Sequence, residues 1–273
     1  MLDVERESIT VGKLSPDHEY YKKVIKRDSD AGDYINEISV YDKEIDDTFV
    51  IHLSLPPDCD SSREYPMIVM TDGVWRLTDH PELRKLMEEG KTDQVIIASI
   101  GYPNDYDYKS IRERDLVNDP ENFLHFIIDN LVPYLTENYP VDTENMTLTG
   151  HSYGGYWGLY ALFHSDTIGK NTFKNYYIGS PSFQAYTDNE NIASFEEAYH
   201  SRNSSLDCNV YITVGSLEGD GFIDPITEFV DLLNERSYDG LNITYEIMED
   251  CEHNTVFKPS IKKAMQMFYG SKK

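Results

Sequence analysis

Runs of apolar residues divide the first half of the chain into strands. Residues 34–40 and 48–55 alternate apolar and polar side chains on either side of a polar segment, which is typical of an antiparallel strand pair. Residues 65–70 and 95–100 are almost continuously apolar, as in strands that helices cover on both faces. Helix-forming residues at 81–89 separate them and end before Gly90, so the pattern predicts a β-α-β unit with a parallel pair.

The second half alternates between helical and strand patterns. Apolar residues recur at helical spacing in 121–138, where Pro133 should kink or divide the helix near Asp129. Further helices are predicted at 156–164, 222–233 and 257–269, and further strands at 145–148, 175–179, 210–214 and 243–248. These elements predict an α/β protein with a mostly parallel central sheet, flanking helices and antiparallel N-terminal strands.

Length and composition indicate one main globular unit. In 273 residues, 40% hydrophobic and 12% aromatic side chains supply enough apolar surface for a full core. Residues 1–30 are polar with mixed charge and are predicted to form an arm or an extra edge element. Residues 31–273 are predicted to form the main domain.

The acidity of the chain disfavours several classes of partner. With 24 Lys and Arg against 49 Asp and Glu, the formal net charge is −25, which repels nucleic-acid phosphates and anionic membranes. We expect neither export nor membrane insertion, because no leader-like segment and no apolar run of about 18 residues stands out. The three cysteines cannot all pair, which favours the cytoplasm. The sequence leaves the oligomeric state open, a homo-oligomer included.

A glycine-rich turn at residues 149–155 carries the strongest chemical signal. It contains Gly-x-Ser-x-Gly, with Ser152 at its centre, between a predicted strand and a predicted helix. This context is typical of a nucleophile elbow, in which Gly150 and Gly154 let the strand and the helix pass closely. A serine hydroxyl needs an imidazole to accept its proton and a carboxylate to orient that imidazole. Two partners are therefore expected further along the chain.

His253 is the predicted base, because it lies between the last strand and the last helix and completes the order serine, acid, histidine. His151 is a poorer candidate, because a residue beside the serine on a tight turn should point elsewhere. The acid should follow the strand at 210–214. Glu218 is preferred there, and Asp220 and Asp224 stay open as alternatives.

A tetrahedral intermediate also needs N–H donors for its oxyanion. The backbone N–H of Tyr153, immediately after the nucleophile, is one predicted donor. The turn after the first central strand should supply the other, from Val74 or Gly73.

Five segments in this order carry a family resemblance: residues 65–73, Arg112-Glu113-Arg114-Asp115-Leu116, residues 150–155, Ser180-Pro181-Ser182 and Glu252-His253-Asn254-Thr255-Val256. Together they resemble the putative-esterase branch of the α/β hydrolases, over roughly residues 33–270. The branch includes siderophore trilactone esterases, feruloyl and acetyl-xylan esterases and S-formylglutathione hydrolases. The resemblance implies an α/β-hydrolase fold and a serine esterase that needs no cofactor.

The Arg-x-Arg-Asp and Ser-Pro-Ser segments are most similar to the siderophore esterases. That similarity implies a pocket for an acyl or catecholate group, shaped by Trp75, Arg112, Arg114, Phe183 and Tyr186. Ion pairs with Asp115 or neighbouring acids explain the two arginines equally well. The acidity of the chain suits an anionic ferric chelate badly, so a siderophore-type lactone and an aryl or feruloyl-like ester both stay open.

Three functions fit these residues. Ester hydrolysis through an acyl-enzyme is preferred; acyl transfer to another alcohol would use the same residues, and a non-catalytic binding protein would keep only the fold. The intact serine and histidine favour catalysis. No metal is expected, because His-Glu-x-x-His is absent and the cysteines are widely spaced.

Overall fold

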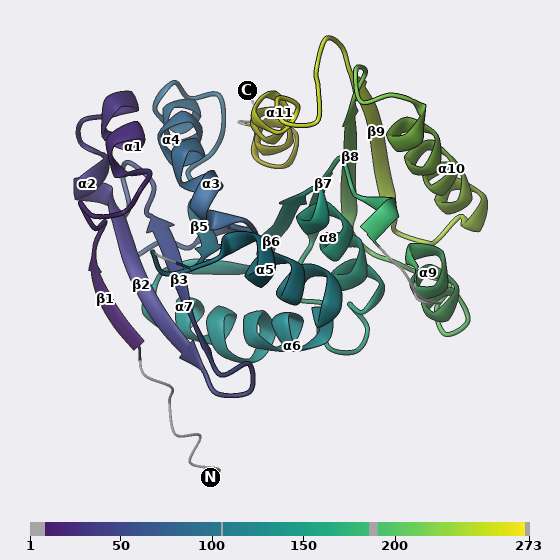
Figure 1. Cartoon of the computed structure of the whole chain (residues 1–273), viewed down its shortest axis with the longest axis horizontal. Coiled ribbons are helices and arrows are strands. Elements are labelled where there is room, and N and C mark those ends of the chain that lie inside the picture. The colour runs from purple at the N-terminus through teal and green to yellow at the C-terminus, as the bar shows by residue number, and fades with distance from the viewer. Residues whose placement is uncertain (1–8, 105, 186–190, 271–273) are drawn as a thin grey trace.

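The computed structural model describes residues 9–104, 106–185 and 191–270. Its centre is a nine-stranded sheet in the order β1-β2-β3-β5-β4-β6-β7-β8-β9 (Figure 1). The strands are β1 (Ile9–Lys13), β2 (Ile35–Asp42), β3 (Asp47–Ser54), β4 (Tyr65–Met70), β5 (Ile96–Gly101), β6 (Val141–His151), β7 (Asn175–Gly179), β8 (Asn209–Gly215) and β9 (Asn242–Met248). Pairing is antiparallel from β1 through β3 to β5 and parallel from β5 to β9.

Helices cover both faces of this sheet. They are α1 (Tyr21–Arg27), α2 (Ala31–Tyr34), α3 (Gly73–Arg76), α4 (His80–Glu88), α5 (Tyr108–Glu113), α6 (Pro120–His125), α7 (Val132–Asn138), α8 (Tyr153–Phe163), α9 (Ile192–His200), α10 (Asp220–Arg236) and α11 (Phe257–Tyr269). Figure 1 shows α4 and α11 on one side of the sheet and α6, α7 and α8 on the other. Successive residues of β4 serve both faces, because Ile68 packs with α4 and α11, whereas Val69 packs in the larger core on the opposite face.

This architecture is the α/β-hydrolase fold, as the sequence predicts. The predicted strands and long helices are present, some with longer bounds. The prediction that the helix at 121–138 is divided is also confirmed, since a π-helical turn at Phe126–Leu131 separates α6 from α7, and Pro133 lies in the first turn of α7.

The N-terminal segment lies against one edge of the sheet. β1 pairs with β2, and Leu14, Val24 and Ala31 pack with Ile35 and Leu77 in a small cluster of their own. None of the described helices combines the length and the hydrophobicity that crossing a bilayer requires.

The carboxyl ends of the parallel strands meet at one edge of the sheet, so the loops that follow β4, β6, β7, β8 and β9 gather there. These loops carry the candidate chemistry.

Candidate active site

The turn between β6 and α8 has the geometry of a nucleophile elbow. Ser152 sits there with φ 62° and ψ −118°, outside the region that non-glycine residues prefer. A Cβ atom on Gly150 would lie 2.2 Å from the carbonyl oxygen of Gly154, which shows how closely the strand and the helix pass. The Ser152 N–H donates to the carbonyl oxygen of Gly179 at 2.9 Å, so β7 supports the turn.

The structure brings His253 together with Glu218. The Nδ1 atom of His253 lies 2.6 Å from Oε2 of Glu218, whose side chain is fully buried. The other two candidate acids, Asp220 and Asp224, lie exposed on the first turns of α10. Of the three carboxylates that the sequence leaves open, the geometry favours Glu218.

Hydrogen bonds hold the Glu218 carboxylate in its ionised form. Its Oε1 atom accepts from the Ser180 hydroxyl and from the Gly215 N–H, each at 2.6 Å. Burial alone would raise the pKa of Glu218, but the hydrogen bonds from His253, Ser180 and Gly215 outweigh it and lower that pKa. The ionised carboxylate can therefore orient the imidazole of His253 and stabilise its charged form.

His151 lies beside His253, on the side of the sheet that α11 covers, and its standing as the poorer candidate for the base stays a prediction. The two rings are 4.7 Å apart, and the His151 ring is 5.7 Å from the ring of Phe257 at the start of α11. The sharp bend comes only at Ser152, so His151 is still the last residue of β6 and faces the helix that covers this side of the sheet. Burial, followed by the charges of Arg76, His253 and Arg112, keeps the pKa of His151 well below its usual value, so this ring stays neutral.

Two serines in the loop after β7 contact the proposed catalytic residues directly. The Ser182 hydroxyl lies 3.1 Å from that of Ser152, and its N–H donates to the Ser152 carbonyl oxygen at 3.1 Å. Ser180 has φ 38°, is fully buried and binds Glu218. The sequence indicates this Ser-Pro-Ser segment only through its family resemblance and does not identify these partners.

The predicted oxyanion donors lie in two turns that touch each other. Gly73 and Val74 begin α3, and Tyr153 begins α8, so their N–H groups belong to first turns, which lack intrahelical acceptors. A Cβ atom on Gly154 would lie 2.3 Å from Oγ1 of Thr71, at the end of β4. The geometry thus fits the predicted donors, and it keeps both Gly73 and Val74 as candidates for the second one.

Arg112 fastens these two turns together. Its Nε and one terminal nitrogen donate to the two carboxylate oxygens of Asp72 at 2.5 and 3.0 Å, and that terminal nitrogen also donates to the His151 carbonyl oxygen at 3.1 Å. Asp72 has φ 61° and therefore occupies a strained position immediately before Gly73. The guanidinium lies 5.0 Å from the ring centre of Tyr153. Arg112 thereby holds the turn before α3 against the elbow.

Residues 43–237 match the family described as Putative esterase. The chain belongs to this family. It shares 26% identity over 160 residues with the ferri-bacillibactin esterase BesA of Bacillus subtilis, covering 50% of this chain and 54% of that protein. With the apo-salmochelin esterase of Escherichia coli O6:H1 it shares 26% identity over 239 residues, covering 74% of this chain and 68% of that protein.

A solved structure confirms the fold of this member of the Putative esterase family. The BES protein from Bacillus cereus superposes with a TM-score of 0.72 at 27% identity, over 86% of this chain and 94% of that one. The match covers about half of the length of BesA and about two thirds of the length of the apo-salmochelin esterase.

The residues predicted to shape the pocket are not all alike: one is exposed, one packs against a helix and one forms ion pairs. Trp75 is 37% exposed, with its ring 5.5 Å from the Arg112 guanidinium, and Phe183 packs 5.4 Å from Phe229 of α10. Arg114 forms the ion pair with Asp115 that the sequence offers as the alternative, at 2.6 Å. Tyr186 lies outside the described residues.

Arg114 also pairs with Asp47 at the start of β3, at 2.6 Å.

Among the described residues, no group of three or more His, Cys, Asp or Glu side chains is arranged to hold a metal ion.

Proposed function

We propose that this chain is a serine hydrolase of carboxylic esters that works through an acyl-enzyme on Ser152. One observation carries the proposal: a buried, hydrogen-bonded Glu218 lies 2.6 Å from His253, in the loops that flank the strained elbow of Ser152. Such a pair serves to move a proton to and from a neighbouring hydroxyl. Membership of the Putative esterase family supports the same conclusion.

In the first half of the reaction, Ser152 Oγ attacks the ester carbonyl carbon while the Nε2 atom of His253 takes the serine proton. The negative charge moves to the carbonyl oxygen, where the N–H groups of Tyr153 and of Val74 or Gly73 stabilise it. Collapse of this intermediate breaks the bond to the alcohol oxygen. His253 gives its proton to the departing alcohol.

Water completes the cycle. His253 removes a proton from a water molecule, whose oxygen attacks the acyl carbon, and a second tetrahedral intermediate forms in the same oxyanion site. Its collapse releases the carboxylic acid and returns the proton to Ser152 Oγ. Glu218 stays ionised throughout and stabilises the imidazolium in each half.

We propose a siderophore-type lactone or an aryl ester as the substrate. Two relatives with 26% identity are named for esters of this kind, ferri-bacillibactin and apo-salmochelin. Trp75, which is exposed beside Arg112, is placed to contact an aromatic group of such a substrate.

Replacement of the nucleophile tests this function. With p-nitrophenyl butyrate, Ser152→Ala should lower kcat by about a thousandfold or more, because no other group can form the acyl-enzyme. Ser204→Ala removes an exposed serine hydroxyl elsewhere and should leave kcat unchanged. Turnover that persists in Ser152→Ala at the wild-type rate would refute the proposed function.

We also propose a cytoplasmic location. All three cysteines are free, and burial raises the pKa of the Cys208 thiol to about 12, so this thiol is unreactive inside the fold. Thiol labelling of protein from acid-quenched cells should find Cys59, Cys208 and Cys251 all reduced. A disulfide between any two of them would contradict this location.

A further inference from the structure

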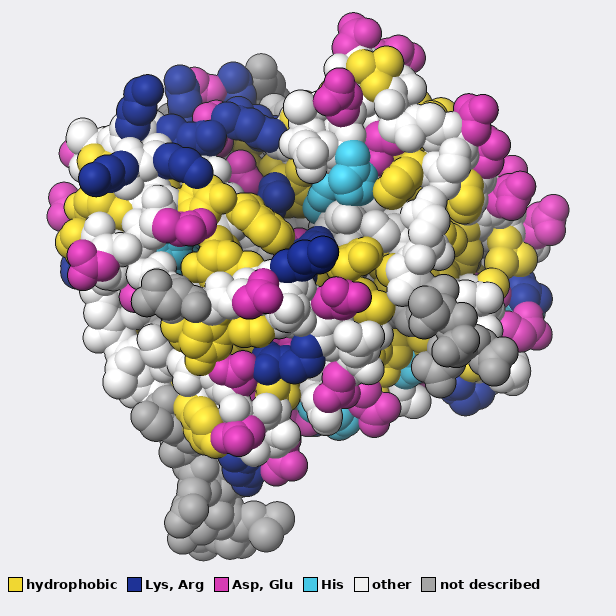
Figure 2. All heavy atoms as spheres, viewed as in Figure 1, with side chains coloured by type: hydrophobic (Ala, Val, Ile, Leu, Met, Phe, Trp, Pro, Cys, Tyr) yellow, Lys and Arg dark blue, Asp and Glu magenta, His cyan; other side chains and the backbone are white. Residues whose placement is uncertain are grey.

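Two helices, α1 and α11, carry positive charge in this acidic chain, and α4, whose own charges cancel, lies between them. Helices α1, α4 and α11 contain nine basic and two acidic residues, a formal charge of +7 in a chain of net charge −25. We call their basic residues the basic face: Lys22, Lys23, Lys26, Arg27, Arg84, Lys85, Lys258, Lys262 and Lys263. Figure 2 shows Lys and Arg side chains gathered over the region of α1 and α4.

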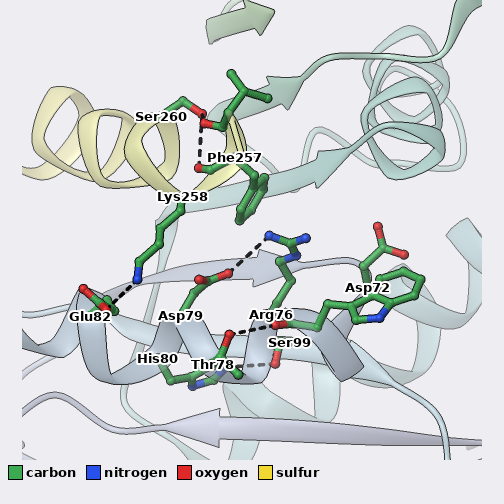
Figure 3. A network of polar contacts seen from close by, with 12 residues as sticks. Asp72, Arg76, Thr78, Asp79, His80, Glu82, Ser99, Phe257, Lys258 and Ser260 are labelled. Carbon is green, nitrogen blue, oxygen red and sulfur yellow. Dashed lines mark hydrogen bonds and ion pairs between the residues drawn. The ribbon is translucent and has the colours of Figure 1, made fainter. Parts of the chain in front are cut away.

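One carboxylate joins these helices without cancelling their charge. Glu82 of α4 pairs with Lys258 at 2.7 Å, with Lys262 at 2.6 Å and with Arg27 at 3.4 Å (Figure 3 shows the bond to Lys258). Hydrogen bonds from Lys258 and Lys262 lower the pKa of Glu82 to about 2. A single negative charge is thus shared among three positive ones, and the helices stay net positive.

The basic face is continuous with the active site. The turn at Asp72 and Gly73, which carries the candidate oxyanion donors and is called the oxyanion turn below, leads into α3 and then α4. The loop of His253 leads into α11. The guanidinium of Arg76 lies 3.8 Å from the ring centre of Phe257 and pairs with Asp79 at 3.2 Å, as Figure 3 shows. The Phe257 ring contacts His151, which contacts His253. In this series Arg76 is the charged group. After burial, its charge helps to lower the pKa of His151, which immediately precedes Ser152, so positive charge from the side of α3 and α4 is felt next to the nucleophile.

We propose that the basic face is an electrostatic guide that draws a multiply anionic ester towards Ser152. The proposal rests on the proposed function and narrows its substrate class. A ferric complex of a catecholate trilactone is an ester of this kind, because its catecholate dianions carry more charge than the iron(III) they bind. A positive region beside a catalytic site raises the association rate of an anionic substrate by roughly tenfold or more.

The charge of the rest of the molecule favours a small anion over a large one. Outside the three helices the chain is more acidic than its net charge, so a nucleic acid or an acidic protein that extends beyond the basic face meets repulsion. A small ester can approach over the basic face alone. The whole-chain charge, which suits an anionic chelate badly, is thus a poor measure of the field at this site.

Two triple variants with the same change in net charge test this guide. Lys22→Gln/Lys26→Gln/Lys85→Gln removes three exposed cations from the basic face. The matched control is Lys170→Gln/Lys174→Gln/Arg202→Gln, at the opposite end of the sheet, where Lys174 immediately precedes β7 and Arg202 pairs with Asp166. For each protein, kcat/KM is measured with the ferric catecholate trilactone and with neutral p-nitrophenyl butyrate.

At low ionic strength, the ratio of anionic to neutral kcat/KM should fall on the order of fivefold in the basic-face variant and stay at the wild-type value in the control. The fall should come from KM rather than kcat. It should vanish near 1 M salt, where the screening length is about 3 Å.

Three results would overturn this proposal. The ratio of anionic to neutral kcat/KM could fall equally in both triple variants, or it could stay unchanged in the basic-face variant. The wild type could also hydrolyse the neutral ester but not the anionic one. Each leaves the proposed function intact, because hydrolysis of the neutral ester still depends on Ser152. Stable binding of a DNA duplex or an acidic peptide to the wild type, lost only in the basic-face variant, would also overturn it in favour of a macromolecular partner.

Discussion

Both oxygen atoms of the Glu218 carboxylate are engaged, which distinguishes it from the exposed carboxylates that crowd this chain. Ser180 and Gly215 occupy one oxygen and His253 the other. A carboxylate held in this way keeps the imidazole in one orientation and one tautomer. Ser180 acts through Glu218, so it is a positioning residue.

Removal of the Ser180 hydroxyl should weaken catalysis through Glu218 alone. Ser180→Ala takes away a hydrogen bond to the ionised carboxylate, so the pKa of Glu218 should rise and kcat should fall about tenfold, most strongly at acidic pH. In a Glu218→Gln background the same change should have little further effect. Measurement of kcat against pH for the two single variants and the double variant checks this, and an undiminished loss in the double variant would contradict it.

Arg112 joins the oxyanion turn to the elbow, so its replacement should weaken catalysis. Arg112→Lys cannot keep both bonds to Asp72 together with the bond to the His151 carbonyl, so the oxyanion turn should lose its fixed position. We expect kcat for p-nitrophenyl butyrate to fall about ten- to a hundredfold with little change in KM. Arg114→Lys, which alters an ion pair with Asp115 and Asp47, is the matched control and should leave kcat near wild type. A rise in KM alone for Arg112→Lys would instead indicate a direct contact with substrate.

Among the elements, α4 is fastened to the sheet by a buried histidine at its first residue. The Nδ1 atom of His80 lies 2.5 Å from Oγ of Ser54 on β3, and its Nε2 atom lies 2.8 Å from Oγ of Ser99 on β5. Burial, assisted by His52, lowers the pKa of His80 to about 3. The helix that follows the oxyanion turn is therefore anchored by a neutral imidazole.

The free energy of unfolding should depend on pH through this anchor. The folded chain keeps His80 neutral down to about pH 3, whereas the unfolded chain protonates it below its ordinary pKa of 6.5. Its contribution is thus fully present above pH 6.5 and is lost as pH falls, by about 1.4 kcal/mol per pH unit. Urea unfolding at pH 6 and pH 5 gives the free energy of unfolding at each pH. Between these two values it should fall by about 1.4 kcal/mol less in His80→Gln than in the wild type. An equal fall in both proteins would contradict the assignment.

Hydrophobic periodicity predicts the long elements well and the short ones badly. The strand at 175–179 and the helix at 257–269 have the predicted bounds, because the strand is buried along its whole length and the helix buries one apolar stripe. Helices α3 and α5 are four and six residues long, too short to be stable alone, and depend on contacts such as that between Arg112 and Asp72.

The site also has residues that the sequence predicts and contacts that only the folded chain shows. The order of serine, acid and histidine along the chain suffices to propose Ser152 and His253 and to place the acid at Glu218, Asp220 or Asp224. The contact of Glu218 with His253 appears only in the folded chain. The contacts of Ser180 with Glu218 and of Ser182 with Ser152 join different loops, so only the folded chain reveals them.

At the scale of the whole molecule, the fold places several loops at one edge of a sheet whose central strands are covered by helices on both faces. The rigid sheet fixes the elbow, the oxyanion turn and the His253 loop relative to one another. Charge is unevenly distributed around these loops, since α11, which follows the His253 loop, is basic, whereas α10 and the chain as a whole are acidic.

Covalent trapping of the nucleophile tests the central claim most directly. After treatment with a fluorophosphonate, which exchanges its fluoride for a serine oxygen, peptide mapping should find one adduct, on Ser152, and hydrolysis of p-nitrophenyl butyrate should fall in proportion to labelling. Ser204→Ala should label like wild type and Ser152→Ala should not label. An adduct on another residue, or full hydrolytic activity in protein labelled at Ser152, would contradict the account.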